Sequence, residues 1–173
     1  PSSIAQGEAQ DSTQLSATSL EVSFQTELTN YAATHTREEL LAYAQIRLNQ
    51  LTAEALADHS LPTTTQSGAS YAYPEPFYEG DPDLNGPTDY QFCINTRSEE
   101  CRRQYNAELL ASAATSSAIF AGCVGLTSGT ALIACAAAAM AVHALNIAAA
   151  KERFQACLTR AYSDCALAYG RKR

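Results

Sequence analysis

The sequence predicts an all-α protein organised around an antiparallel helical hairpin that nested disulfides hold together. The first observation is the cysteine spacing, because the six cysteines form three pairs that are each equidistant from Gly129. The second is an alanine-rich stretch with no charged residue between Glu108 and Lys151. The third is a pair of helical hydrophobic patterns further upstream, in residues 18–60. Together they predict a three- or four-helix bundle.

The cysteine symmetry selects one disulfide pairing. In two antiparallel helices that turn at Gly129, residues equidistant from Gly129 face each other, which predicts the pairs Cys93–Cys165, Cys101–Cys157 and Cys123–Cys135. A disulfide requires Cα atoms about 4.4–6.8 Å apart, closer than ordinary helix axes, so small residues must line the contact between the helices. The many alanines of residues 111–150 meet this need. No CxxC pair is present, which argues against a zinc site.

The two arms of the hairpin are predicted at about 97–127 and 130–169. Thr96-Arg97-Ser98-Glu99 has the pattern of a capping box, which would start the first arm and leave Cys93 just outside it. Gly170 is suited to end the second arm. His143 lies in an apolar arm and is expected to be a hydrogen-bonded core side chain.

Upstream of the hairpin, residues 1–17 are polar and are predicted to be a flexible lead. Leu20, Phe24, Leu28 and Tyr31 then follow helical spacing. After an interruption at residues 34–36, a capping box at residues 36–39 opens a second helix, which is predicted to run to about residue 58. Residues 18–170 are therefore expected to form one helical domain, with the N-terminal helices (18–60) packed on the disulfide hairpin (93–170).

Residues 61–92 are predicted to be an aromatic and acidic loop, because proline, glycine, serine and threonine interrupt any helix there. Tyr71, Tyr73, Phe77 and Tyr78 gather between prolines. One interpretation is that these rings cover the open end of the helical core. The other is an interaction loop, since exposed tyrosines suit contacts with sugars or proteins.

The same loop contains a candidate calcium site. Its alternating oxygen-bearing residues are followed by the glycine that a sharp turn needs, and the candidate ligands are Asp81, Asp83, Asn85, Pro87 (through its carbonyl) and Asp89. Over about twelve residues the stretch resembles the calcium loops of EF-hands and of aspartate-rich repeats in extracellular proteins. The resemblance implies calcium as a cofactor. The departure is Phe92, which occupies the position of the usual bidentate glutamate, and a plain turn is the alternative.

The uncharged stretch 109–150 approaches membrane-spanning length in each arm. Serine and threonine dilute the first arm and the tip, however, so a hairpin core or a tip that contacts another subunit is the favoured interpretation. Contact with a membrane is the alternative.

Charge and cysteine content limit the cellular compartments and the classes of partner that suit this protein. Three structural disulfides indicate an oxidising compartment, which can be extracellular, periplasmic or the cell surface, and the chain is expected to be secreted or at the cell surface. No signal peptide pattern opens the sequence, from which we expect a mature or trimmed chain. The net charge of −7 argues against a nucleic-acid partner, and residues 171–173 form a short basic tail.

No catalytic motif is present, and we expect a protein that is not an enzyme. The leading hypothesis is a structural or interaction protein that self-associates into an oligomer or filament, stabilised by calcium, or binds another extracellular protein. A membrane-active, toxin- or bacteriocin-like protein that inserts residues 109–150 is the second hypothesis. A calcium-dependent extracellular ligand-binding module is the third.

Overall fold

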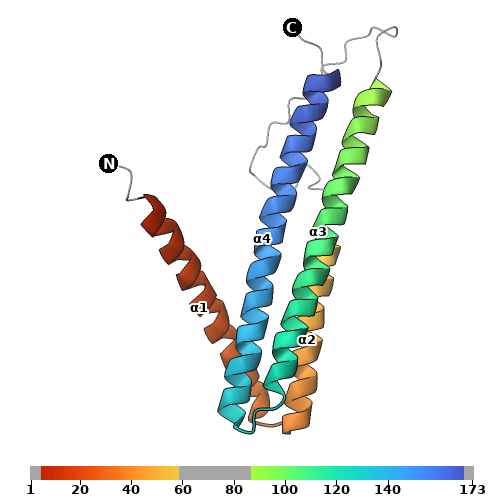
Figure 1. The fold of residues 1–173 in the computed structure, drawn as a ribbon. Coiled ribbons are helices and arrows are strands. Elements are labelled where there is room, and N and C mark those ends of the chain that lie inside the picture. Colours follow the sequence, from red (N-terminus) through yellow and green to blue (C-terminus); the bar gives the residue numbers. More distant parts are fainter. Residues whose placement is uncertain (1–4, 59–86, 170–173) are drawn as a thin grey trace. The chain divides into compact units, whose positions relative to one another are not determined.

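The structure is a computed structural model, in which residues 5–58 and 87–169 are described, with side chains from residue 17 to 58 and from 89 to 169. These residues form four helices, α1 (Ala5–Ala32), α2 (Arg37–Ala57), α3 (Pro87–Cys123) and α4 (Gly129–Tyr169), and none of them belongs to a strand (Figure 1). The predicted all-α class is confirmed.

The chain divides into two compact units that share α3 and α4. Unit 1 comprises Pro1–Leu56 and Leu109–Ala148, and unit 2 comprises Ala57–Glu108 and Ala149–Arg173. Unit 1 therefore contains α1, almost all of α2 and the halves of α3 and α4 that meet at their connecting turn. Each unit is described separately below.

The predicted nested disulfides are confirmed. Cys123–Cys135 lies in unit 1, and Cys93–Cys165 and Cys101–Cys157 lie in unit 2. The paired Cα atoms are 5.7, 5.9 and 5.8 Å apart, respectively, within the range that a disulfide spans. α3 and α4 are thus antiparallel neighbours in both units (Figure 1). The symmetry of the sequence identified which residues face each other.

The start of the first arm differs from the prediction. α3 begins at Pro87, so Cys93 lies inside the helix and Thr96-Arg97-Ser98-Glu99 is helix interior rather than a cap. Proline suits the first helical position because its φ angle is already helical and its missing N–H has no partner to lose there. Asp89 in the first turn also favours a helix start, because its charge complements the helix dipole. Residues 87–92, predicted as loop, are helical for the same reasons.

The turn between the arms also differs. α3 ends at Cys123 and α4 begins at Gly129, so the connection is residues 124–128 and Gly129 is not its centre. Ser128 accounts for the shift, because its Oγ accepts a hydrogen bond from the backbone N–H of Ala131 at 3.5 Å and its carbonyl accepts from Leu132 N–H at 2.9 Å. A serine at this position is a preferred helix N-cap.

The capping box predicted before α2 is confirmed. Thr36 N–H donates to Glu39 Oε2 at 2.8 Å, and Glu39 N–H donates to Thr36 Oγ1 at 3.3 Å. The reciprocal pair satisfies two backbone donors at the helix start. α1 extends upstream to Ala5, so residues 5–17 are helical, while the flexibility predicted for residues 1–17 stays a prediction.

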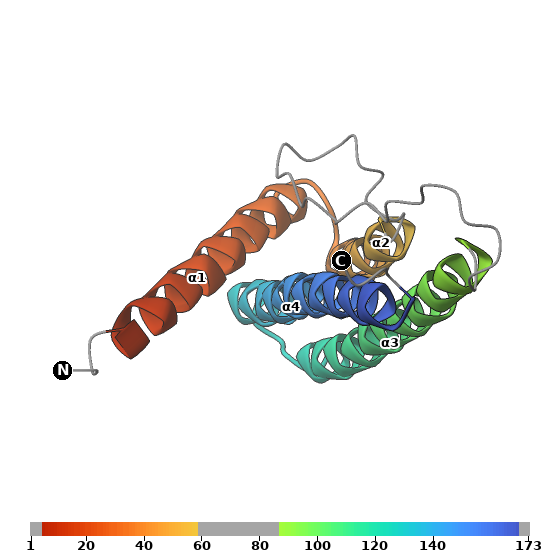
Figure 2. The same ribbon diagram turned by 90° about the horizontal axis from the view of Figure 1, so that it is seen from above.

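The core of unit 1 forms where the α1–α2 pair meets α3 and α4. Leucines, alanines and aromatic rings from all four helices contribute, and Figure 2 shows α2 beside α4. The fully or nearly buried members are Phe24, Leu28, Leu40, Ala44, Leu48, Phe120, Cys123, Leu132, Ala136, Ala137, Ala139, Met140 and Ala141.

The α1–α2 pair has polar links of its own. Glu27 of α1 accepts hydrogen bonds from Tyr43 Oη at 2.5 Å and from Arg47 Nε at 2.7 Å, both on α2. Partial burial acts to raise the pKa of Glu27, but the hydrogen bonds from Tyr43 and Arg47 outweigh it and lower that pKa. The rings of Tyr31 and Tyr43 also stack, with centroids 4.1 Å apart.

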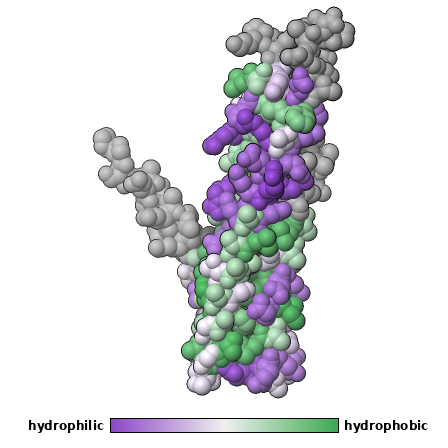
Figure 3. Space-filling model, turned by 45° about the vertical axis from the view of Figure 1, so that its right-hand side comes forward, coloured by the Kyte–Doolittle hydropathy of each residue, from purple (hydrophilic) through white to green (hydrophobic). Residues whose placement is uncertain are grey.

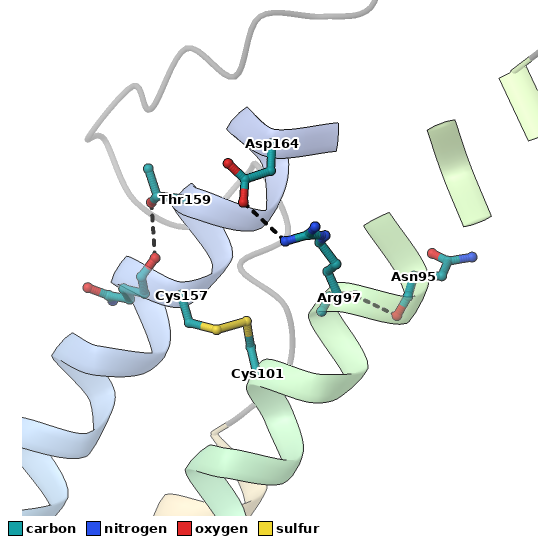
Figure 4. Close-up of a disulfide and its surroundings, with 8 residues drawn as sticks. Asn95, Arg97, Cys101, Cys157, Thr159 and Asp164 are labelled. Atoms are coloured by element: carbon teal, nitrogen blue, oxygen red, sulfur yellow. Dashed lines mark hydrogen bonds and ion pairs between the residues drawn. A yellow bond between two sulfur atoms is a disulfide. The ribbon is translucent and has the colours of Figure 1, made fainter. Parts of the chain in front are cut away.

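In unit 2, the described contacts run along α3 and α4. The rings of Tyr105 and Phe154 stack at 5.0 Å, and Tyr90, Ile94 and Cys165 form a second apolar group. Exposed ion pairs flank these contacts, among them Arg97–Asp164, Arg153–Glu108 and Lys151–Asp58. Figure 4 shows the Arg97–Asp164 pair beside the Cys101–Cys157 disulfide. Exposed pairs of this kind contribute little stability, so they add little to the two disulfides and the apolar contacts that join α3 and α4 in unit 2.

Candidate functional site

One surface of unit 1 consists of exposed, uncharged residues along α3, which we call the α3 face. They recur at helical spacing on the side of α3 that its core residues leave open. Two are large, Leu110 at 59% exposure and Ile119 at 39%. The members of the α3 face are Leu110, Ala111, Ala114, Thr115, Ala118, Ile119, Ala121 and Gly122.

The side chains of the α3 face are almost all apolar. Thr115 is its only hydroxyl-bearing member, and its Oγ1 donates to the Ala111 carbonyl of the same helix at 3.0 Å. The face therefore offers methyl and methylene groups between two large apolar residues, without a side-chain donor that needs water. Scattered exposed apolar residues are ordinary, but a continuous stripe on one helix suits a protein contact.

Gly122 adds a second observation at the end of the α3 face. A Cβ built at this glycine meets no heavy atom within 4 Å, so packing among the described residues does not require a glycine there. Glycine in a helix costs roughly 0.5–1 kcal/mol relative to alanine. Because glycine has no side chain, nothing projects from the helix at this position, and another backbone can approach closely there.

Charge is distributed differently in the two units. The described parts of α3 and α4 in unit 1, residues 109–123 and 129–148, carry no charged side chain, whereas in unit 2 the same helices carry paired charges. On the face that Figure 3 shows, hydrophobic and pale residues cover much of unit 1, and hydrophilic residues concentrate in unit 2. The uncharged surface therefore belongs to the parts of α3 and α4 that lie in unit 1.

A buried polar cluster joins three helices of unit 1. His143 of α4 is 0% exposed, its Nδ1 lies 2.8 Å from Ser112 Oγ of α3, and its Nε2 lies 2.8 Å from Thr52 Oγ1 of α2. The prediction that His143 is a hydrogen-bonded core side chain is confirmed. Burial lowers the pKa of His143 from its ordinary value of 6.5, because the charged imidazolium loses hydration.

The hydrogen bonds assign the neutral tautomer of His143. The Thr52 hydroxyl donates to the Leu48 carbonyl at 3.3 Å, so it accepts from the imidazole Nε2–H. Nδ1 is then the acceptor and receives the Ser112 hydroxyl proton. Ser112 and His143 have the separation of a nucleophile and its base, but both are buried, so this pair acts in packing rather than presenting a nucleophile to a substrate.

One turn along α3 from Ser112, Ser116 is fully buried, and its Oγ has no hydrogen-bond partner among the described residues. An unpaired buried hydroxyl costs about 1–3 kcal/mol of desolvation. We therefore expect Ser116→Ala to raise the free energy of unfolding by about 1 kcal/mol. Urea denaturation followed by circular dichroism measures this, with Ser117→Ala on the same helix as the control that should change little. A loss of stability in Ser116→Ala would show that the hydroxyl is paired.

Arg37, at the start of α2, binds the turn between α3 and α4, which we call the tip of unit 1. Its guanidinium Nη2 donates to the backbone carbonyls of Val124 and Leu126, at 2.7 and 2.8 Å, in the turn that follows α3. A cation at the C-terminal end of a helix also complements the helix dipole. Sequence inspection did not identify this contact, because the carbonyls that Arg37 binds carry no side-chain signature.

The loop sites predicted from the sequence lie outside the described residues. This applies to Tyr71, Tyr73, Phe77 and Tyr78, and to the calcium ligands Asp81, Asp83 and Asn85. Pro87 and Asp89 lie in the first turn of α3, and Phe92 is a 72% exposed residue of the same helix. In the part of the chain with described side chains, no group of three His, Cys, Asp or Glu residues is placed to hold a metal ion. The calcium site stays a prediction.

By length and composition, α4 qualifies as a candidate membrane span. Its most apolar window has a mean hydropathy of 1.9, and 44% of that window is buried inside the protein. A core helix meets the same criterion, so the observation is weak evidence for a membrane location.

Comparison with protein-family models, with curated proteins and with solved structures finds no match for this chain.

Proposed function

We propose that this protein is a secreted or cell-surface interaction protein that self-associates through the α3 face of unit 1. The observation that carries the proposal is the continuous exposed stripe from Leu110 to Gly122, which has no charged member. The three disulfides are compatible with an oxidising, extracellular compartment.

A second copy of the chain is the occupant that the α3 face suits best. Alanines and a glycine allow two helix backbones to approach closely, and Leu110 and Ile119 offer apolar side chains at either side of the small residues. In a two-fold dimer, the large side chains of the α3 face of one copy would pack against the small residues of the α3 face of the other. Calcium binding by the loop around Asp81, as the sequence predicts, would add a further level of stabilisation to such an assembly.

Introduction of a charge into the α3 face is expected to weaken self-association. Leu110→Lys would bury an unpaired ammonium group in the contact, so we expect at least about a tenfold weaker association constant. Sedimentation equilibrium with and without calcium measures it. Ile46→Lys is the matched control, because Ile46 is a similarly exposed residue (53%) of unit 1 on α2. A monomeric wild-type protein at high concentration, or equal masses for Leu110→Lys and wild type, would contradict the proposal.

Membrane insertion of residues 109–150 is the second candidate function, and the apolar window of α4 favours it. The same preparations separate the two candidates when they are added to dye-loaded vesicles of zwitterionic and anionic lipid. Self-association without dye release between pH 4 and 8 supports the interaction protein. Dye release that Leu110→Lys abolishes supports insertion.

A further inference from the structure

Unit 1 is built from two helical pairs that are each held together internally. The α1–α2 pair has the Glu27 hydrogen bonds with Tyr43 and Arg47, together with the stacked tyrosine rings. The α3–α4 pair has the Cys123–Cys135 disulfide. We call the contact between the two pairs the seam. Separation along the seam would leave the internal links of both pairs intact.

The seam is largely apolar. Phe24, Leu28, Leu40 and Leu48 of the α1–α2 pair meet small and apolar residues of α3 and α4, including Met140. Among the described residues, polar contacts that cross the seam include those of Arg37 at the tip and the Thr52–His143 hydrogen bond. Of these, the His143 contact contains the group that titrates near neutral pH.

We infer that His143 is an acid-sensitive latch, and that its protonation opens the seam so that the α1–α2 pair leaves the disulfide-linked α3–α4 pair. A proton added at Nδ1 meets the Ser112 hydroxyl, which already directs its own proton there. Ser112 must turn its proton away, and a charged ring must remain at a position with 0% exposure. Opening of the seam hydrates the imidazolium and removes both costs.

The sign of the pH effect follows from burial. Because burial lowers the pKa of His143 in the closed state, the open state binds the proton more tightly. The closed state is therefore fully stabilised above pH 6.5, and its advantage is lost as the pH falls from 6.5 towards the lower pKa of the closed state. Within that interval, the opening equilibrium rises by up to tenfold for each pH unit.

Other charged groups around the cluster do not provide the effect. Burial alone accounts for the lowered pKa of His143. Glu27 has a pKa below its usual range, so it stays ionised through the same pH interval. Five other charged side chains lie nearest in the sequence to Thr52, Ser112 and His143 or lie on the packed side of α1. They are Glu21, Arg47, Glu54, Glu108 and Lys151. None of these contributes to the pKa shift of His143, and Arg47, Glu108 and Lys151 each have an ion-pair partner.

Hydrogen–deuterium exchange of α2 tests the latch on the full-length, oxidised protein. When the seam opens, the α1–α2 pair keeps its internal links but loses the apolar packing against α3 and α4. Helices without such packing are marginal in water, so α2 amides exchange. α2 contains no cysteine, and its peptides can be recovered without reduction. Between pH 7 and 5, after correction for intrinsic exchange, we expect α2 protection to fall by up to tenfold per pH unit. Peptides of α4 around Cys135 should keep more protection.

His143→Gln is expected to remove the pH dependence, because glutamine can donate and accept hydrogen bonds but does not titrate. His35→Gln is the matched control and should behave as wild type. His35 is exposed in the turn between α1 and α2, where its Nδ1 lies 2.8 Å from the Tyr31 carbonyl oxygen. Retention of the acid opening in His143→Gln would overturn the proposal.

If His143→Gln does not fold, the wild-type protein decides the question. A logarithmic plot of the α2 opening constant against pH should then have a slope near one proton, and the imidazole Cε1–H resonance of His143 should titrate in parallel. A slope near zero between pH 7 and 5 would overturn the latch. The experiment reads opening within one chain at low concentration, so it is independent of the proposed self-association.

Discussion

Reduction of the three disulfides is expected to unfold unit 2 while unit 1 keeps protected helices. In the chain-entropy description, a cross-link over a 56- or 72-residue separation contributes about 4 kcal/mol when it forms alone, and the 12-residue one about 3 kcal/mol. Because the three cross-links are nested, each inner one shortens the loop that the next one closes, and their sum is smaller than that of the single values. Whole domains are stable by only about 5–15 kcal/mol. The described core of unit 2 lies along α3 and α4, whereas in unit 1 the α1–α2 pair covers the same two helices.

Amide exchange with and without a phosphine reductant measures this difference. Residues 90–105 of α3 should lose nearly all protection, and residues 132–141 of α4 should retain part of it. The double variant Cys123→Ser/Cys135→Ser is a useful comparison, because it removes only the disulfide of unit 1 and should leave residues 90–105 protected. Equal protection of residues 90–105 in oxidised and reduced protein would mean that packing alone holds unit 2.

Leu28→Ala is expected to lower the free energy of unfolding of unit 1 by about 3 kcal/mol. Leu28 is 0% exposed in the core between the two helical pairs, and truncation of a buried leucine removes apolar contacts and leaves a cavity. Because Leu28 belongs to α1, the loss falls on the attachment of the α1–α2 pair. Chemical denaturation followed by circular dichroism measures the change.

Val22→Ala is the matched control for Leu28→Ala. Val22 lies on the same helix but is 55% exposed, so its truncation should change stability by no more than about 0.5 kcal/mol. If both variants lose the same free energy, the burial of Leu28 does not account for the attachment of the α1–α2 pair. Helix propensity would not explain such a loss, because alanine is the better helix former at both positions.

The hairpin was predictable because disulfide chemistry and helix geometry impose the same constraint on the sequence. Cysteines equidistant from a central residue can be joined in an antiparallel pair without distortion, and the alanines between them permit Cα separations below 6 Å. The start of α2 was predictable from its capping box, because both partners lie within four consecutive residues.

Helix ends without a dedicated signal were less predictable. The start of α3 lies in a segment of aspartate, proline and glycine, and these residues favour both turns and helix N-termini. The cysteine spacing predicts a turn at Gly129, but symmetry gives only the facing register of two helices and not the residue at which each one ends.

The partners of His143 could not be read from the sequence. Thr52 is 91 residues from His143 and Ser112 is 31 residues from it, on two other helices. A hydrophobic pattern predicts that this part of α4 is buried, but it gives no information on which hydroxyl groups reach a buried ring. The α3 face was equally hidden, because an alanine-rich stretch without charges looks the same whether it is core or surface.

The outermost disulfide also determines how the chain carries mechanical load. Cys93–Cys165 joins two points that are 72 residues apart in the sequence. Tension applied between the segment before Cys93 and the segment after Cys165 passes through the sulfur–sulfur bond and not through the intervening helices. At about 3.4 Å per extended residue, roughly 240 Å of chain is thereby shielded from stretching. No disulfide joins the α1–α2 pair to the hairpin. Tension applied through α1 would therefore act on the seam, while the disulfide-linked hairpin keeps its length.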